Sequence, residues 1–400
     1  MNATVNRGYF SFSLLSMYAD TLLMAVGYFM LVPLLGYHFI QELGWSAALS
    51  GSVLAVSGVV QNGMKLFLGM LADRMGYRRA IMLGVATRVA GYYLYATVVH
   101  PVGFVLAAIV SGLGGAMFHP ASYAAYARLS DARIKNRIYA IRETLSNIGF
   151  IIGPVIGMFL LKTDFRLVCL SAAAMFTLSF VTTWFLIPSL KGNGENGAPF
   201  RNLFLLAARN KRFVVFNLLM SGMWALWGQL YLVVPIRAQT VLSDPSAVSY
   251  LYMSGAAFMV LCQLPAIHWL DRCFKPAHIL AMGVALLGAA LFVMGASSGF
   301  WSLMAAVIVF TAGQMICTPT MNTMISRYAP EGCFATFFGF SGVWLAVGSL
   351  AGNSLSGFLF DWADGGRYGW LPWTTLFVYA LLLSAALLWS GKTLEPKGRG

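Results

Sequence analysis

The stretch Gly69-Met-Leu-Ala-Asp73-Arg74-Met-Gly76-Tyr77-Arg78-Arg79 follows directly on a long apolar run and places four charges within seven residues. A weaker copy, Trp269-Leu270-Asp271-Arg272-Cys-Phe-Lys275, lies 198 residues later. A short charged segment that follows an apolar run once in each half of a chain indicates a membrane protein built from two related halves.

The composition of the chain excludes an ordinary soluble domain. Hydrophobic residues make up 59% and charged residues 10%, with a mean hydropathy of +0.74, whereas soluble domains carry about 25% charged residues. The net charge of +13 does not indicate nucleic-acid binding, because the basic residues lie in short clusters between apolar runs. The five cysteines show no CxxC spacing, so we expect reduced, small apolar side chains and no metal site.

The apolar runs predict twelve membrane-spanning helices, since a span needs about 20 apolar residues. The expected spans are 9–35, 46–71, 80–99, 101–124, 140–161, 166–188, 212–237, 246–269, 277–297, 300–325, 335–360 and 371–391. A polar Gly/Asn-rich segment divides them, which predicts a six-helix bundle at 1–189, a cytoplasmic linker at 190–211 and a second six-helix bundle at 212–400. The apolar stretch after Arg7 is too long for a signal-peptide core, so we interpret it as the first span.

The distribution of basic residues predicts that both termini lie in the cytoplasm. With that orientation the external loops hold only Lys162, Arg166, Arg237 and Arg367. The internal segments hold Arg7, Arg74, Arg78, Arg79, Arg128, Arg133, Lys135, Arg137, Arg142, Lys191, Arg201, Arg209, Lys211, Arg212, Arg272, Lys275, Arg327, Lys392, Lys397 and Arg399.

The two halves repeat one another at a nearly constant offset. The matching pairs are Pro33 with Pro235, Gln61 with Gln263, Arg128 with Arg327, and Gly153 with Gly352. Such duplication is typical of transporters whose halves rock about a central site. Membrane helices also share Gly and Pro by chance, but four matches at offsets of 199 to 202 disfavour that alternative.

The run from Gly69 to Arg79 resembles the loop motif G-x-x-x-D-R-x-G-R-R/K of the major facilitator superfamily, with Tyr77 where an Arg is usual. Asp73 and Arg74 are expected to begin the turn, and Gly76 to adopt a conformation closed to other residues. Asp73 can also lie at the positive end of a neighbouring helix and act as a conformational latch. The alternative is a solvated turn. The expected latch residues are Gly69, Asp73, Arg74, Gly76, Arg78, Asp271 and Arg272.

The segment Gly149-Phe-Ile-Ile-Gly153-Pro154-Val-Ile-Gly157 resembles the G-x-x-x-G-P-x-x-G-G signature of proton-linked antiporters in that superfamily, with Met158 replacing the last Gly. Glycines four apart let helices approach closely, although generic small-residue packing gives the same pattern. Over the whole chain the resemblance is to the 12-span drug:proton antiporters. It includes the run Ser111–Gly115, but Ala108 stands where many antiporters have an Arg. The resemblance implies a monomeric exporter in a bacterial inner membrane.

Ionisable residues within spans are costly, at about 2.5–3.5 kcal/mol each on insertion scales, and are candidates for function. Asp20 is the acid deepest in any expected span and is the first candidate for proton coupling; a permanent pair with Arg88 or Lys65 is the alternative. Glu143 is the second candidate, unless it is a solvated acid at a helix start. His119 is a third candidate, as a proton relay, against a role in packing.

The resemblance places substrate contacts mainly on spans one, four, seven and ten. The candidates are Tyr28, Phe29, Gln61, Asn217, Trp224, Trp227, Gln229, Gln314 and Asn322. Aromatic walls with scattered amides suit large lipophilic cargo, cationic cargo included. Lipid-facing aromatic residues are the alternative.

These features predict a proton-driven exporter of lipophilic compounds, such as drugs or siderophore-like metabolites. The alternatives are an inward permease for a nutrient or metal, since the 21 Met suit Cu(I), and a transporter-like receptor. No nucleotide-binding loop, zinc signature or nucleophile elbow is visible, so we expect no enzyme activity and no cofactor. The expected partners are the substrate, protons and the lipid bilayer.

Overall fold

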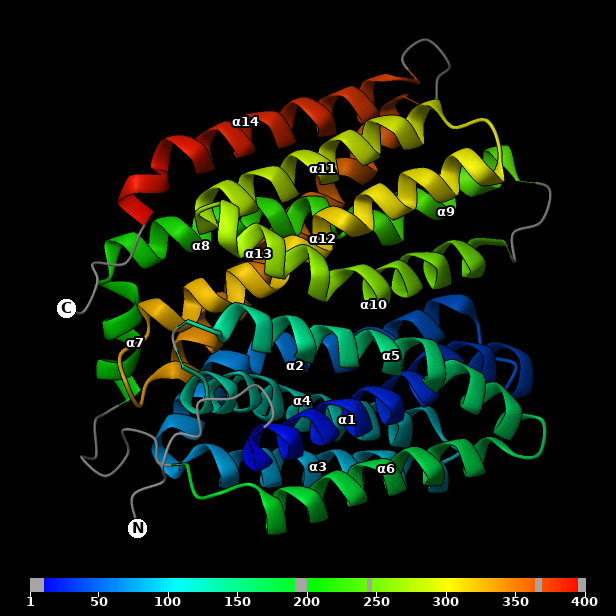
Figure 1. The fold of residues 1–400 in the computed structure, drawn as a ribbon. Coiled ribbons are helices and arrows are strands. Elements are labelled where there is room, and N and C mark those ends of the chain that lie inside the picture. The colour runs from blue at the N-terminus through cyan, green and yellow to red at the C-terminus, as the bar shows by residue number, and fades with distance from the viewer. Residues whose placement is uncertain (1–10, 132, 191–199, 243–246, 364–368, 395–400) are drawn as a thin grey trace. The chain divides into compact units, whose positions relative to one another are not determined.

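The computed structural model describes residues 11–131, 133–190, 200–242, 247–363 and 369–394, and the regular elements in these residues are all helical (Figure 1). The long helices are α1 (Phe12–Tyr37), α2 (Ala47–Met75), α3 (Tyr77–Thr97), α4 (Pro101–Leu129), α5 (Lys135–Leu161), α6 (Phe165–Leu186), α8 (Lys211–Trp227), α9 (Gln229–Val241), α10 (Ala247–Cys273), α11 (Pro276–Ala296), α12 (Phe300–Tyr328), α13 (Phe334–Ala363) and α14 (Leu371–Leu394). A short π-helix, His38–Glu42, extends α1.

Eleven stretches in the described part of the chain are long and apolar enough to cross a membrane, with α8 and α9 forming one of them. The helix α3 is the twelfth span of the predicted fold, and its arginines and tyrosines lower its hydropathy. The prediction of an all-α membrane protein with twelve spans is therefore confirmed.

Several spans are longer than expected, because polar turns continue a helix beyond its apolar core. The span predicted at 46–71 continues to Met75, and the span predicted at 140–161 begins at Lys135. The seventh span is divided at Gly228 into α8 and α9. In the expected linker, Phe200–Ala208 forms the short helix α7, while residues 191–199 lie outside the described residues.

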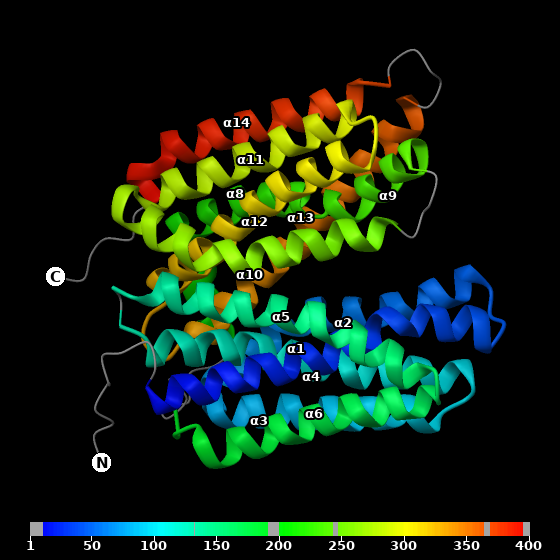
Figure 2. The same ribbon diagram turned by 45° about the vertical axis from the view of Figure 1, so that its right-hand side comes forward.

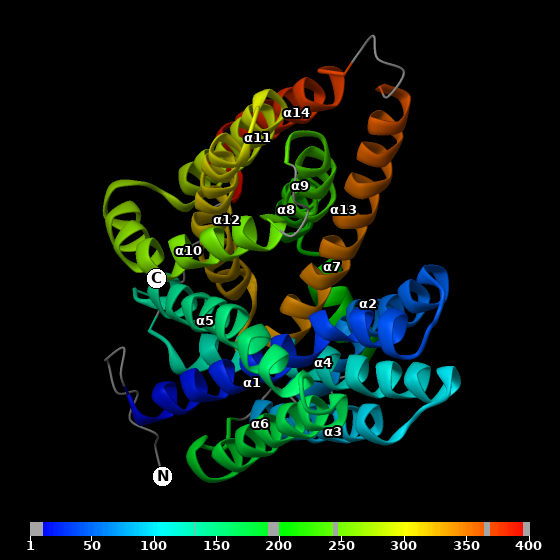
Figure 3. The ribbon, with the colours of Figure 1, turned by 90° about the vertical axis from the view of Figure 1, so that its right-hand side faces the viewer.

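The chain forms two compact units. Unit 1 comprises Met1–Ala207 with Ala329–Val343, and unit 2 comprises Ala208–Tyr328 with Trp344–Gly400. Within unit 1, α1 packs against α5 and α6, and α4 packs against α2 and α3 (Figure 2). Within unit 2, α11 packs against both α12 and α14 (Figure 3). The first turns of α13 thus belong to unit 1 although they lie late in the sequence.

The glycines of the antiporter-like segment form the contact between α5 and α1. A side chain at Gly153 would come within 2.9 Å of the backbone of Phe29 and Met30, and Gly149 and Gly157 are similarly crowded by α1. Helix α5 runs without a break through Pro154.

The same packing recurs in unit 2, where Gly348 and Gly352 of α13 abut Ser221 and Ala225 of α8. Gly352 is the sequence counterpart of Gly153. The internal repeat therefore duplicates a close helix contact and not only a sequence pattern.

Replacing Gly153 with leucine should destabilise unit 1 by about 1–3 kcal/mol, because the added side chain must displace the backbone of α1. The measurement is the thermal unfolding midpoint of the detergent-purified protein, which should fall. The control is Ile152→Leu at the neighbouring exposed position, which should leave the midpoint unchanged. An unaltered midpoint for Gly153→Leu would show that α1 and α5 do not need this contact.

Candidate functional site

The charged segment after the second span is more helical than the sequence predicts. Asp73 and Arg74 do not begin a turn; they lie in the last turn of α2, which ends at Met75. Gly76 alone separates α2 from α3, with a φ of +89° that favours glycine, as predicted.

The Asp73 carboxylate caps the first turn of α13. It accepts hydrogen bonds from the backbone N–H groups of Ala335, at 3.0 Å, and Thr336, at 2.6 Å, and the residue is 1% exposed. Gly69 permits this approach, because a side chain there would lie 2.5 Å from the Ala335 carbonyl oxygen. Asp73 is therefore a buried group at a helix N-terminus and not part of a solvated turn.

The other expected latch residues have separate contacts. The Arg74 guanidinium lies 4.1 Å from the centre of the Phe200 ring, and Arg78 donates a hydrogen bond to the Trp184 carbonyl oxygen. Asp271 and Arg272 are exposed at the end of α10. The second copy of the charged segment therefore does not reproduce the buried cap of the first.

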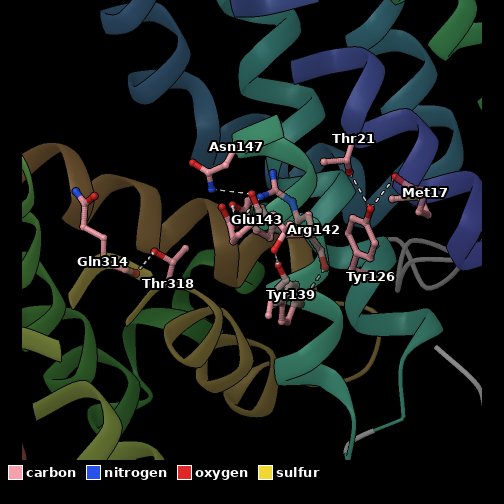
Figure 4. A network of polar contacts seen from close by, with 12 residues as sticks. Met17, Thr21, Tyr126, Tyr139, Arg142, Glu143, Asn147, Gln314 and Thr318 are labelled. Carbon is pink, nitrogen blue, oxygen red and sulfur yellow. Dashed lines mark hydrogen bonds and ion pairs between the residues drawn. The ribbon is translucent and has the colours of Figure 1, made fainter. Parts of the chain in front are cut away.

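Glu143 lies at the centre of a network of polar contacts in unit 1 (Figure 4). Its carboxylate accepts from Arg142 at 2.6 Å and from the Tyr123 hydroxyl at 3.2 Å. The Arg142 guanidinium also lies 3.9 Å from the centre of the Tyr123 ring. Because α5 begins at Lys135, Glu143 lies more than two turns inside the helix. The alternative of a solvated acid at a helix start is therefore wrong.

This network continues to the first turns of α13. The Tyr123 ring stacks on Phe338 with 5.0 Å between centroids, and the Tyr139 hydroxyl donates to the Tyr123 carbonyl oxygen. Phe338 belongs to the same segment of unit 1 whose first turn Asp73 caps. Glu143 is therefore connected to that segment through contacts with Tyr123 and Phe338.

Asp20 joins α1 to α6. Its Oδ1 accepts hydrogen bonds from the hydroxyls of Ser179 and Thr183, its Oδ2 has no hydrogen-bond partner, and the residue is 0% exposed. No ion pair links it to Arg88 or Lys65, so the alternative of a permanent charge pair is wrong in the part of unit 1 that the structure describes.

Replacing Asp20 with asparagine should leave folding and gradient-driven transport within about twofold of the wild type, because the amide oxygen still accepts from both hydroxyls. Asp20→Leu leaves those hydroxyls without an acceptor and should lower the yield of folded protein. Transport rate and size-exclusion profile check the two variants. Loss of transport in folded Asp20→Asn would instead assign proton coupling to this residue.

The remaining ionisable candidates lie on three helices of unit 1, α2, α3 and α4. Arg88 is 2% exposed and donates to the Gln61 side chain at 2.8 Å, while Lys65 donates to Asn62 at 2.8 Å. His119 packs edge-on against Phe118. The Arg88 guanidinium is therefore held inside unit 1.

The expected substrate residues fall into two sets. In unit 1, the rings of Tyr28 and Phe29 meet edge to face at 5.1 Å. In unit 2, Trp224 contacts Trp227 at 5.0 Å. Of the expected substrate residues, four amides lie in unit 2 and are almost fully buried: Asn217, Gln229, Gln314 and Asn322.

Three residues of the site were missed by sequence reasoning. Arg142 was counted as a cytoplasmic charge, and Ser179 and Thr183 carried no motif. The sequence signal for Arg142 was its position next to Glu143. Inside a long span each of these charges is costly unless it is paired with an opposite charge.

Comparison with known proteins decides the family. The family model described as "Major Facilitator Superfamily" matches residues 21–243 and 230–399. The chain belongs to the major facilitator superfamily. Its homologues and fold neighbours are transporters, and it is not an enzyme.

Curated relatives in the superfamily are named "Multidrug resistance protein MdtH". The protein from Edwardsiella ictaluri is 30% identical over 377 residues, which is 94% of each chain. The protein from Escherichia coli O1:K1 / APEC is 30% identical and covers 92% of each chain.

Solved structures show the same superfamily fold. The human organic anion transporter MFSD10 has a TM-score of 0.75 at 15% identity and covers 93% of this chain and 99% of its own. A variant of the E. coli fucose:proton symporter FucP has a TM-score of 0.76 at 14% identity, with coverages of 94% and 98%. At these identities the likeness shows the fold alone.

Proposed function

We propose that this chain is a proton-coupled antiporter that exports lipophilic small molecules across a bacterial inner membrane. Its membership of the superfamily and its 30% identity to multidrug resistance proteins support this function. In this proposal the bundles at 1–189 and 212–400 move relative to one another during transport. Both termini lie in the cytoplasm, and a monomer is the functional unit.

The pair of Arg142 and Glu143 is the observation that carries the proposal. Ionised Glu143 holds Arg142 at 2.6 Å and also accepts from Tyr123. A proton on Glu143 removes the charge that holds Arg142, so the guanidinium is released towards Tyr123 or water. Glu143 is partly exposed, so a proton can reach it, whereas Asp20 is enclosed by α1 and α6.

The same proton affects the attachment of α13. Tyr123 contacts both Glu143 and Phe338, and the first turn that contains Ala335 and Thr336 is capped by Asp73. A neutral Glu143 accepts the Tyr123 hydrogen bond more weakly than a carboxylate does, which weakens one side of this attachment. The Asp73 cap then determines whether the segment stays bound. Protonation and release of α13 are thereby coupled within unit 1.

The methionine pairs do not favour copper transport. Met220, Met223, Met321 and Met324 are all buried at 5% exposure or less. They pack within unit 2, which is an ordinary use of methionine in a helical core.

Transport into inverted membrane vesicles tests the proposal. With an acidic interior, vesicles containing the protein should accumulate a lipophilic fluorescent dye, and a protonophore should release it. Vesicles without the protein give the background. Gradient-independent uptake, or uptake of Cu(I) without uptake of any organic compound, would contradict proton-coupled export.

A further inference from the structure

Arg88 reaches the interior of unit 1 through a space made by two glycines. It leaves α3 and passes α4 at Gly114 and Gly115, and its Nη2 donates to the Gln61 oxygen at 2.8 Å. A side chain at Gly114 would lie 2.7 Å from Arg88 Cγ, and one at Gly115 would overlap both the guanidinium and the Gln61 amide. The run Ser111–Gly115 therefore admits a guanidinium to the contact between α4 and α2.

The charge of Arg88 has no carboxylate partner in the described part of unit 1. Its Nε is buried without a hydrogen bond, and its other neighbours are the rings of Tyr28, at 5.1 Å, and Phe176, at 5.8 Å. Lys65 lies four residues after Gln61 on α2, about one helical turn along, and its ammonium donates to the neutral Asn62. The two side chains form a concentration of positive charge inside the membrane.

The carboxylates in the described spans of unit 1 are engaged elsewhere. Asp20 accepts from α6, Asp73 caps α13, and Glu143 is paired with Arg142. An uncompensated buried charge costs several kcal/mol, even after water penetration. A group that brings a negative charge to Arg88 and Lys65 would therefore bind with a large electrostatic gain.

We propose that Arg88, Lys65 and Gln61 form a binding subsite for the carboxylate of an amphipathic aromatic compound. A guanidinium suits a carboxylate because it donates two parallel hydrogen bonds, and the ammonium adds a second positive charge. Gln61, Lys65 and Tyr28 are all partly exposed, so a ligand can reach them. The Tyr28 ring, already beside Arg88, is the aromatic surface for the rest of the molecule.

This subsite deepens the proposed function and rests on it, because it names organic anions as a class of exported cargo. It also changes the expected charge of the cargo. The aromatic residues alone suit lipophilic cations, whereas Arg88 and Lys65 repel a cation from this part of unit 1.

Equilibrium binding to the full-length, detergent-purified protein tests the subsite without requiring a proton gradient. The probes are 2-naphthoate and the neutral 2-naphthamide, which share a ring and differ in charge, in chloride-free buffer with titration calorimetry as the readout. The wild type should bind the carboxylate at least about tenfold more tightly than the amide. In Arg88→Gln this preference should disappear while amide binding is unchanged.

Lys65→Gln is the second variant, and it should reduce the preference without abolishing it. Both variants are checked for a monodisperse size-exclusion profile. Equal affinity for the two probes in the wild type, or a preference that survives in Arg88→Gln, would overturn the subsite. Chloride binding that depends on Arg88, with no binding of naphthoate, would also overturn it, because the site would then bind an inorganic anion. Anion binding without proton-driven transport would instead contradict the proposed function alone.

Discussion

Glu143→Gln should reduce gradient-driven efflux to the level of vesicles without the protein. Glutamine keeps the size of the side chain and can still accept from Arg142 and Tyr123, but it cannot gain and lose a proton. The driving proton then has no binding site, while the contacts that hold the fold are largely kept.

The measurement compares two transport modes in the same proteoliposomes. Uphill transport driven by a pH gradient should be lost, whereas exchange of labelled for unlabelled cargo at equal pH should continue. Glu331→Gln is the matched control, because Glu331 is an exposed acid of unit 1 that pairs with Arg128 at 3.2 Å. Unaltered uphill transport in Glu143→Gln would remove Glu143 from the coupling mechanism.

Asp73→Asn should shift the population of the α13 segment towards release from unit 1 by about tenfold. The carboxylate accepts from two backbone N–H groups at a helix N-terminus. Asparagine keeps one acceptor oxygen but loses the charge, and its NH2 group faces the second backbone N–H. The loss of the charge and of one hydrogen bond costs about 1–2 kcal/mol, and 1.4 kcal/mol corresponds to a factor of ten.

Spin-label distances between the start of α3 and the end of α12 measure this shift. Labels at the exposed Arg79 and Arg327, with Cys262 and Cys273 replaced by serine, should show a larger population of long distances in Asp73→Asn. Asp271→Asn is the control, because this sequence counterpart is exposed at the end of α10. Identical distributions for Asp73→Asn and the wild type would show that the cap does not hold α13.

The positions of the spans could be predicted from the sequence, because each lipid-crossing helix requires a long apolar run. Gly76 was also predictable, since its position in a short charged segment required an unusual φ. The ends of the helices could not be predicted, because polar turns such as the one at Lys135 continue a helix without any apolar signal.

The partners of the charged groups could not be predicted from the sequence. Asp73 and Ala335 are 262 positions apart, and nothing in either local pattern links them. A permanent pair with Arg88 or Lys65 was the alternative to proton coupling for Asp20, because charges inside a membrane tend to pair. In the structure Asp20 instead accepts hydrogen bonds from two hydroxyls of α6. Such hydroxyls are too common in membrane spans to be singled out in a sequence.

Proton release on cargo binding tests most directly whether Glu143 carries the coupled proton. The purified protein in weakly buffered detergent solution is titrated with cargo while a pH-sensitive dye reports free protons. Wild type and Asp20→Asn should both release protons in proportion to the cargo bound, and Glu143→Gln should bind cargo without releasing any. Proton release that persists in Glu143→Gln, or that is lost only in Asp20→Asn, would contradict the proposed mechanism.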